Sequence, residues 1–475
     1  MESLPINPPL AMAIPFGILL GAIALGPLWF ADWWGRHYGK VSLALAAIVV
    51  GIYVTVFRGA GEVWQTARDY ISFICLIGSL FVISGGIHIN VKGEATPLVN
   101  VFFLLIGALV ANALGTTGAS MLLVRPWLRM NKYRLTAHHV VFFIFIVSNV
   151  GGSLSPVGDP PLFLGYLKGV PFGWVGSQCW PMWATGVGIL LAMFFVRDTA
   201  NFRRAPARVR EEETAHEQWR FLGLSNALFL GLVIGAVFIK RPPFLREALM
   251  AAAAAGSYFT TRKSVHDSND FNFHPIKEVA LLFAGIFGTM IPALDWLQGH
   301  AGQLVQPTSG LFYWGSGTLS SVLDNAPTYL SFLSAEFGTF AIPEKAAAVL
   351  VWLKTHGPDV AAATGPHAEQ ICQVITALKT HHPQVLLDGS YTQAHAEMGL
   401  LLGNPLYVKC LRAISIGSVF FGANTYIGNG PNFMVKAIAD QQKTHTPTFL
   451  GYFFKFTLPF MLPMLLVVWW LFFRG

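Results

Sequence analysis

Long apolar segments, each separated from the next by a polar one, recur from one end of the chain to the other. A helix needs about 20 mostly apolar residues to cross the hydrocarbon core of a membrane. The pattern predicts ten membrane-spanning helices, at residues 10–30, 41–57, 70–90, 135–165, 173–196, 219–239, 245–260, 276–294, 405–438 and 448–473. The expected fold is therefore an all-α polytopic membrane protein.

Two further apolar segments, 98–124 and 306–335, are interrupted near their middle by polar and helix-breaking residues. The first contains Gly115-Thr116-Thr117-Gly118, and the second contains Ser320-Ser321-Val322-Leu323-Asp324-Asn325-Ala326-Pro327. Non-helical backbone at membrane depth persists only where protein or a wet cavity satisfies its polar groups. Both segments are predicted to be re-entrant hairpins, and an ordinary kinked helix is the alternative.

The composition agrees with a lipid environment, because 54% of the residues are hydrophobic, 12% are charged and the mean hydropathy is +0.54. A soluble protein carries about twice that share of charge. These values exclude a disordered chain and a basic nucleic-acid-binding protein. Four widely separated cysteines suggest neither a disulfide framework nor a metal site. The chain start lacks a basic region, so the first apolar segment is expected to be a retained anchor.

Lysine and arginine residues predict the orientation, since they are enriched in cytoplasmic loops. The two most basic segments, 125–134 and 197–220, fall on the same side of the ten-span arrangement, which places the N-terminus outside. Residues 336–404 are then external, and this insert carries three lysines against six acidic residues. The excess charge of +7 reflects the cytoplasmic loops rather than an acidic partner.

The order of spans and hairpins repeats with inverted orientation. Each half consists of four spans and one hairpin, the arrangement expected of a secondary transporter built from inverted repeats. The predicted organisation is an N-terminal span at 1–40, a first repeat at 41–197, a basic cytoplasmic linker with a connecting span at 198–244, and a second repeat at 245–475 containing the insert 336–404.

One span in each half is itself broken, at 148–161 and at 422–432, where glycine and proline residues prevent a continuous helix. Unwound backbone exposes carbonyl oxygens and helix ends that can hold ions. Asp159 lies in the first break and Asp324 in the second hairpin, and an ionised carboxylate at membrane depth is costly unless paired, hydrated or bound to a cation. For each, a structural role is the alternative: Asp159 as a helix N-cap and Asp324 as part of a turn.

Polar side chains around the breaks complete the predicted binding site, although each could instead satisfy broken backbone. These are Ser148, Asn149, Ser155, Asn325, Asn424, Thr425, Asn429 and Thr117. His138 and His139 are interpreted as structural, as are the histidines of the insert. The chain has no GxxxxGK[ST], HExxH or GxSxG motif, which disfavours ATP-driven pumping and the usual hydrolases.

At these same positions the sequence resembles the ion transporter superfamily. Asn149 to Asp159 is similar to the pattern N-x-G-G-x-x-S-P-x-G-D of NhaD-type sodium/proton antiporters, and Ser320 to Pro327 is similar to their S-x-x-x-D-N-x-P hairpin. Pro160-Pro161 differs from the residues that usually follow this aspartate in the antiporters. Asn424-Thr425 resembles the Ser-Asn-Thr signature of carboxylate symporters. Sequences that share these features look like those labelled citrate transporters.

The resemblance implies an ion site at Asp159 and Asp324, elevator-type alternating access, and a homodimer formed through the scaffold. We therefore expect a secondary transporter, not an enzyme, in the inner membrane of a bacterium. The leading hypothesis is sodium/proton antiport, with Na⁺ and H⁺ competing at the two aspartates and no cofactor. The alternative is Na⁺- or H⁺-coupled symport of citrate or a related carboxylate. Expected partners are membrane lipid, a small inorganic ion and a carboxylate substrate, without nucleic acid.

Overall fold

The computed structural model describes residues 6–90, 95–204, 220–239, 241–304, 307–358 and 367–474. Most of this part of the chain is helical, and two short strands, β1 (His88–Asn90) and β2 (Arg220–Leu222), pair antiparallel. Residues 205–219, which include Arg208 and Arg210 of the predicted basic linker, lie outside the described residues, as do residues 359–366 of the predicted insert.

The helices of the N-terminal half lie between Leu10 and Arg204. Its helices are η1 (Leu10–Ala13), α1 (Ile14–Trp29), α2 (Ala31–Thr55), α3 (Ala60–Gly85), α4 (Pro97–Met130), η2 (Lys132–Arg134), α5 (Ala137–Ile146), η3 (Val150–Gly152), α6 (Pro160–Leu167) and α7 (Phe172–Arg204).

The remaining helices follow the strand β2. They are α9 (Asn226–Val237), α10 (Leu245–Thr260), α11 (Lys263–Ser268), α12 (His274–Leu304), α13 (Ser309–Val322), α14 (Asn325–Phe340), α15 (Pro343–His356), α16 (Ala368–His381), α17 (Pro383–Asp388), α18 (Gln393–Gly403), α19 (Pro405–Phe421), η5 (Gly422–Asn424), α20 (Gly430–Gln441), α21 (Phe449–Tyr452), η6 (Phe453–Met461), α22 (Leu462–Val468) and η7 (Trp469–Phe473).

Eight helical segments in the described part of the chain are long and apolar enough to cross a membrane, so the protein is a multi-pass membrane protein. The predicted spans at 41–57 and 70–90 are too short, because α2 and α3 begin at Ala31 and Ala60. Both helices start with charged turns, which an apolar-length criterion omits because a helix continues beyond the hydrocarbon core. The predicted spans at 219–239 and 245–260 correspond to the shorter helices α9 and α10.

The segment predicted as the first hairpin folds back on itself. A straight helix of 34 residues would be about 50 Å long. Instead, Asn100 near the start of α4 donates a hydrogen bond to Asn131 just beyond its end, at 2.8 Å. The backbone reverses at Gly115, whose φ of 73° lies in the left-handed region that favours glycine. The hairpin is therefore observed, and a kinked continuous helix is excluded.

The second predicted hairpin has the same shape. Helix α13 ends at Val322 and α14 begins at Asn325, and the two helices run antiparallel. The rings of Phe312 near the start of α13 and Phe340 at the end of α14 lie 6.4 Å apart between centroids. Helix α14 continues to Phe340, so Glu336, which the sequence placed at the start of the insert, is a buried residue of this hairpin.

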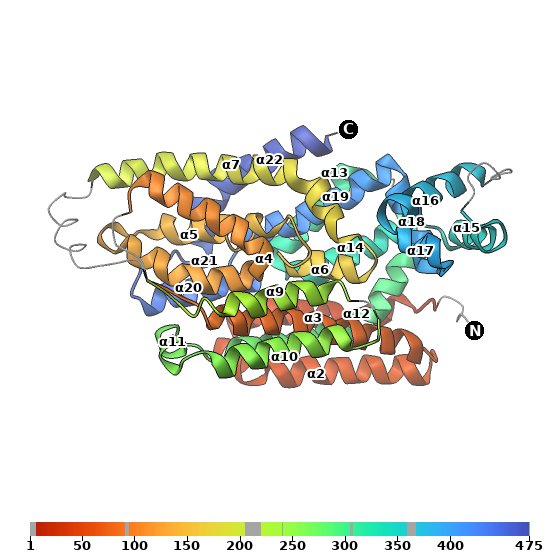
Figure 1. The fold of residues 1–475 in the computed structure, drawn as a ribbon, viewed down its shortest axis with the longest axis horizontal. Helices are drawn as coiled ribbons and strands as arrows, with labels where there is room; N and C mark the ends of the chain where they lie inside the picture. The colour runs from red at the N-terminus through yellow and green to blue at the C-terminus, as the bar shows by residue number, and fades with distance from the viewer. Residues whose placement is uncertain are drawn as a thin grey trace.

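Most of the long helices run roughly parallel along the longest axis of the molecule (Figure 1). Helices α2, α3, α10 and α12 pack together along one side, whereas α4, α5 and α7 lie on the other. The insert helices α15 to α18 gather at one end, and α11 lies at the opposite end (Figure 1). The insert and α11 are therefore at opposite ends of the molecule, and the side of the membrane on which each lies stays a prediction.

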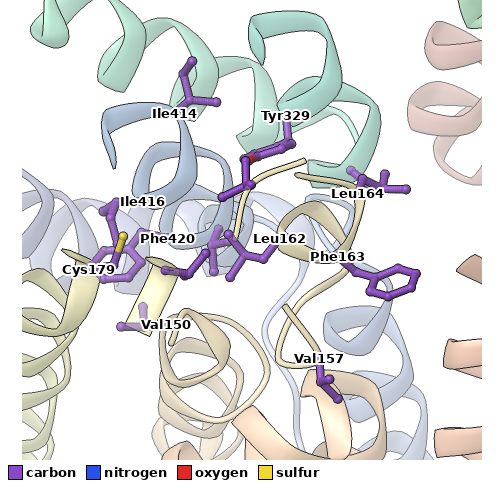
Figure 2. Packing of buried hydrophobic residues seen from close by; sticks show 14 of the residues in the cluster. Val150, Val157, Leu162, Phe163, Leu164, Cys179, Tyr329, Ile414, Ile416 and Phe420 are labelled. Carbon is purple, nitrogen blue, oxygen red and sulfur yellow. The ribbon is translucent and has the colours of Figure 1, made fainter. Parts of the chain in front are cut away.

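The core beside the two helix breaks is tightly packed with apolar side chains (Figure 2). Val150 lies in the first break and Leu162 directly follows it, Phe420 comes from α19 and Tyr329 from α14. None of these four is more than 1% exposed. Because apolar packing surrounds the breaks, each polar group inside them must find its partner within the protein.

Candidate functional site

Both broken helices are built around a pair of glycines that touch through their backbones. In the first break, a Cβ on Gly158 would lie 2.1 Å from the carbonyl oxygen of Gly152, and in the second, a Cβ on Gly428 would lie 2.6 Å from that of Gly422. Only glycine allows such a close approach. In each break the second glycine directly precedes the N-cap residue of the next helix, which is Asp159 for α6 and Asn429 for α20.

Asp159 is the centre of the site. Its side chain is 1% exposed and does not cap α6, which decides against the capping alternative. Its Oδ1 accepts hydrogen bonds from Thr116 Oγ1 at 2.6 Å and from Asn429 Nδ2 at 3.2 Å. Its Oδ2 accepts one from Asn325 Nδ2 at 2.5 Å. The tip of the first hairpin, the start of α14 and the second break therefore meet at one carboxylate.

This carboxylate has only neutral donors around it. Within the described ranges, no lysine, arginine or histidine forms an ion pair with Asp159. A buried carboxylate without a cationic partner is costly and marks a functional site in a membrane protein. The arrangement suits a group that binds either a proton or a small cation.

Oxygen atoms beside Asp159 could complete a cation site. The side-chain carbonyl oxygen of Asn325, whose amide donates to Asp159, is buried and has no hydrogen-bond partner among the described residues. Oxygen ligands of this kind suit hard cations. Asp159, Thr116 and Thr117 also line a cavity of about 20 Å³, together with apolar residues such as Leu80 and Phe163. That volume accommodates about one water-sized species.

An amide network connects the first break to the second. Asn149 donates to Asn432 Oδ1 at 2.6 Å and to the carbonyl of Ile144 at 2.8 Å. Asn429 donates to Asn149 Oδ1 at 3.1 Å and to the Ser148 carbonyl at 3.2 Å. The two breaks are thus held together by side chains that are far apart in sequence, with Asp159 at one edge of the network.

Asp324 has a different role in this conformation. Its carboxylate caps α14 by accepting a hydrogen bond from the backbone N–H of Ala326 at 3.1 Å, and its side chain is half-buried. The neighbouring Asn325, not Asp324, contacts Asp159. The turn alternative is therefore observed for Asp324, and this role remains compatible with ion binding.

The other predicted residues hold the breaks in place. Ser155 donates to the Asn112 carbonyl at 2.5 Å, and Ser148 shares a hydrogen bond of 2.7 Å with Ser120. Asn424 donates to Ser321 Oγ at 2.9 Å, and Thr425 donates to the Ser321 carbonyl at 2.6 Å. Asn424 and Thr425 therefore join the second break to the second hairpin. No hydrogen bond among the described residues links either of them directly to Asp159.

Sequence reasoning selected Thr117, whereas the structure brings Thr116 to Asp159. It also omitted Asn432, which bridges Asn149 to the carbonyls of Gly422 and Thr425. The spacing Asn429-Gly-Pro-Asn432 could have indicated it, because the two asparagines flank the start of α20.

A second buried polar cluster lies at the base of the first hairpin, away from the breaks. Arg134 makes two hydrogen bonds to the carboxylate of Asp198, one of them at 2.9 Å. His138 Nε2 and His139 Nε2 lie 3.2 and 3.0 Å from the same carboxylate. Asn100 donates to it at 2.9 Å. The two histidines and Asp198 are spaced closely enough to bind a metal ion, but the guanidinium already supplies the positive charge, which indicates an ion-pair cluster.

Comparison with known proteins adds two findings. A family described as "putative citrate transport" matches residues 6–473, almost the whole chain. Two proteins named as uncharacterized transporters, from two strains of Mycobacterium tuberculosis, are each 26% identical over 321 residues. Each match covers 61% of this chain and 73% of the relative.

Proposed function

The chain belongs to the family described as "putative citrate transport", and from this premise we propose that it is a secondary active transporter that exchanges Na⁺ for H⁺ at Asp159. One observation carries the proposal: Asp159 is buried in the middle of two broken helices and two hairpins, and its carboxylate meets hydroxyl and amide donors instead of a cationic side chain. The missing positive charge is supplied by the transported cation or by a proton.

Exchange follows from competition for the same oxygen atoms. When Na⁺ binds, it takes ligands from Asp159 and from nearby carbonyl oxygens such as that of Asn325, and a proton on Asp159 removes the negative charge that Na⁺ needs. Because the two species exclude each other, each passage of the site across the membrane carries one or the other. We propose that this passage is an elevator-type movement of the hairpins and broken helices against α2, α3, α10 and α12.

Symport of citrate or a related carboxylate is the second candidate, favoured by the description of the family. In that mechanism Asn149 and Asn424 would donate hydrogen bonds to the substrate. Their amide groups already donate to Ile144, Asn432 and Ser321. The cavity of about 20 Å³ beside Asp159 is also far smaller than a tricarboxylate. Symport thus requires a rearrangement of the amide network, whereas cation exchange does not.

Two further proposals accompany this function. We place the protein in the inner membrane of a bacterium, since the similar transporters come from Mycobacterium tuberculosis. We also propose a homodimer formed through the scaffold, which consists of the helices α2, α3, α10 and α12 against which the hairpins move. Cross-linking in native membranes measures the oligomeric state directly, and a species of twice the monomer mass is expected.

Asp324→Asn is expected to lose ion-driven transport while remaining folded. Asparagine caps a helix as well as aspartate does, so α14 keeps its start, but the site loses a negative charge. An interaction with a charged group contributes about 1.5–3 kcal/mol, which corresponds to about a 10- to 100-fold lower rate. Transport into liposomes measures the change. Normal transport by a well-inserted Asp324→Asn protein would assign Asp324 to capping alone.

The proposed function is tested with purified protein in liposomes that contain a trapped pH dye. A pH gradient is imposed, and Na⁺, Li⁺ or K⁺ is added with and without citrate. Dissipation of the gradient by a cation alone is the expected result, and empty liposomes provide the control. A response that requires citrate would overturn the exchanger and establish carboxylate symport.

A further inference from the structure

A large cavity lies at the C-terminal end of α6, which is the end farther from Asp159. Its volume is about 560 Å³, within the usual range of about 300–1,000 Å³ for small-molecule sites. Its walls come from the start of α3, the end of α6, the connection between α9 and α10, and residues of the insert including Met398. The eight residues of α6 span about 12 Å, which separates this cavity from Asp159 by one short helix.

Three cationic side chains line this cavity against two acidic ones. Arg68, Lys168 and Arg246 are the cations, and Asp69 and Glu247 are the carboxylates. Lys168 Nζ pairs with Asp69 Oδ2 at 2.9 Å, and Arg246 Nη2 pairs with Glu247 Oε1 at 2.9 Å. One positive charge therefore exceeds the carboxylates of the wall.

Arg68 supplies this excess charge. Its side chain is exposed and its guanidinium carbon lies 5.9 Å above the ring of Phe244. None of the ion pairs formed among the described residues includes Arg68. The Phe244 ring restricts the guanidinium while its N–H groups remain available, and a guanidinium binds a carboxylate through two parallel hydrogen bonds.

Lys168 and Arg246 can contribute as well. Arg246 also donates to Ser72 Oγ at 2.8 Å, which keeps its guanidinium against the cavity wall. A ligand with several carboxylates could bind Arg68 through one group and compete with Asp69 or Glu247 for the other two cations through the rest. A monocarboxylate could make only the first of these contacts.

We propose that this cavity is a binding site for a small di- or tricarboxylate anion, held by Arg68 together with Lys168 and Arg246. The site is separate from Asp159 and goes beyond the proposed ion exchange, since the anion can bind here whether or not it is transported. Its position between α3, the end of α6 and the insert places the anion where three parts of the protein meet. Competition for Lys168 would also loosen the contact between α6 and α3.

Equilibrium binding of radiolabelled citrate to the purified full-length protein in detergent tests the proposal. Arg68→Gln is expected to bind citrate about 10- to 100-fold more weakly than the unmodified protein, because one charged hydrogen-bonding partner is lost. Arg36→Gln is the matched control, as Arg36 is also an exposed arginine but lies on α2 outside the cavity, and its binding should not change. Acetate should compete poorly at equal ionic strength.

Asp159→Asn distinguishes this site from the ion site. Citrate binding that persists in Asp159→Asn but weakens in Arg68→Gln supports the cavity, even if no Na⁺/H⁺ exchange is found. Binding that is lost in Asp159→Asn and unchanged in Arg68→Gln would place citrate at the helix breaks and overturn the proposal. An unmodified protein that binds no citrate would overturn it as well.

Discussion

Asp159→Asn is expected to abolish cation-coupled transport while the protein stays folded. The substitution keeps the size of the side chain but replaces the only charged group in the hydrogen-bonded cluster formed with Thr116, Asn325 and Asn429. Removing one partner of a buried ion pair costs about 3–5 kcal/mol, so the affinity for the transported cation should fall about 100- to 5,000-fold. Cation-driven dissipation of a pH gradient in liposomes measures this loss.

Asp32→Asn is the matched control for this experiment. Asp32 is exposed near the start of α2, and the same change there should leave transport unaffected. Thermal unfolding of each purified variant shows whether it is folded. If Asp159→Asn transported normally and only its unfolding temperature fell, Asp159 would have a structural role and the proposed ion site would be wrong.

Asp198→Asn is expected to be the most destabilising single substitution of a carboxylate described here. The Asp198 carboxylate is fully buried and contacts Arg134, His138, His139 and Asn100. Its neutralisation leaves the guanidinium of Arg134 buried without a counter-charge, which costs about 3–5 kcal/mol of the free energy of unfolding. Because the cluster connects both ends of the α4 hairpin to α5 and α7, the loss should affect the whole hairpin.

A thiol-reactive dye can follow this unfolding in detergent, since Cys179 and Cys410 are free and buried in the folded protein. Asp270→Asn provides the control, because its ion pair with Arg125 spans 3.4 Å and the Asp270 side chain is 76% exposed. Such surface pairs contribute about 0–1 kcal/mol. Equal unfolding temperatures for Asp198→Asn and Asp270→Asn would contradict the structural role of the cluster.

The sequence was sufficient for features that depend on local composition. Apolar segments of membrane length predict helices because lipid offers no partners to an unsatisfied backbone. The hairpin at Gly115 and the breaks at 148–161 and 422–432 were also predictable, since glycine and proline act on the backbone at their own positions. The insert and the basic loops could be assigned to opposite ends from the charges of each segment, which can be counted without any tertiary contact.

The roles of individual side chains depended on contacts between distant segments. Asp159 and Asp324 both precede a helix, yet only Asp324 caps one, because Asp159 is turned toward donors from α4, α14 and the second break. Successive residues on a helix point about 100° apart, which is why Thr116 reaches Asp159 and Thr117 does not replace it. His138 and His139 look like ordinary helix residues until Asp198, some 60 positions away, is placed beside them.

The sequence alone therefore determined that this is a membrane protein with two hairpins and two broken helices, because each of these features is written in the residues of one segment. Only the tertiary structure decided which carboxylate lies at the centre of the site, which threonine reaches it and which cations share the cavity beyond α6. Those answers depend on the directions in which side chains point when segments far apart in the chain are packed together, and composition along the chain carries no information on such directions.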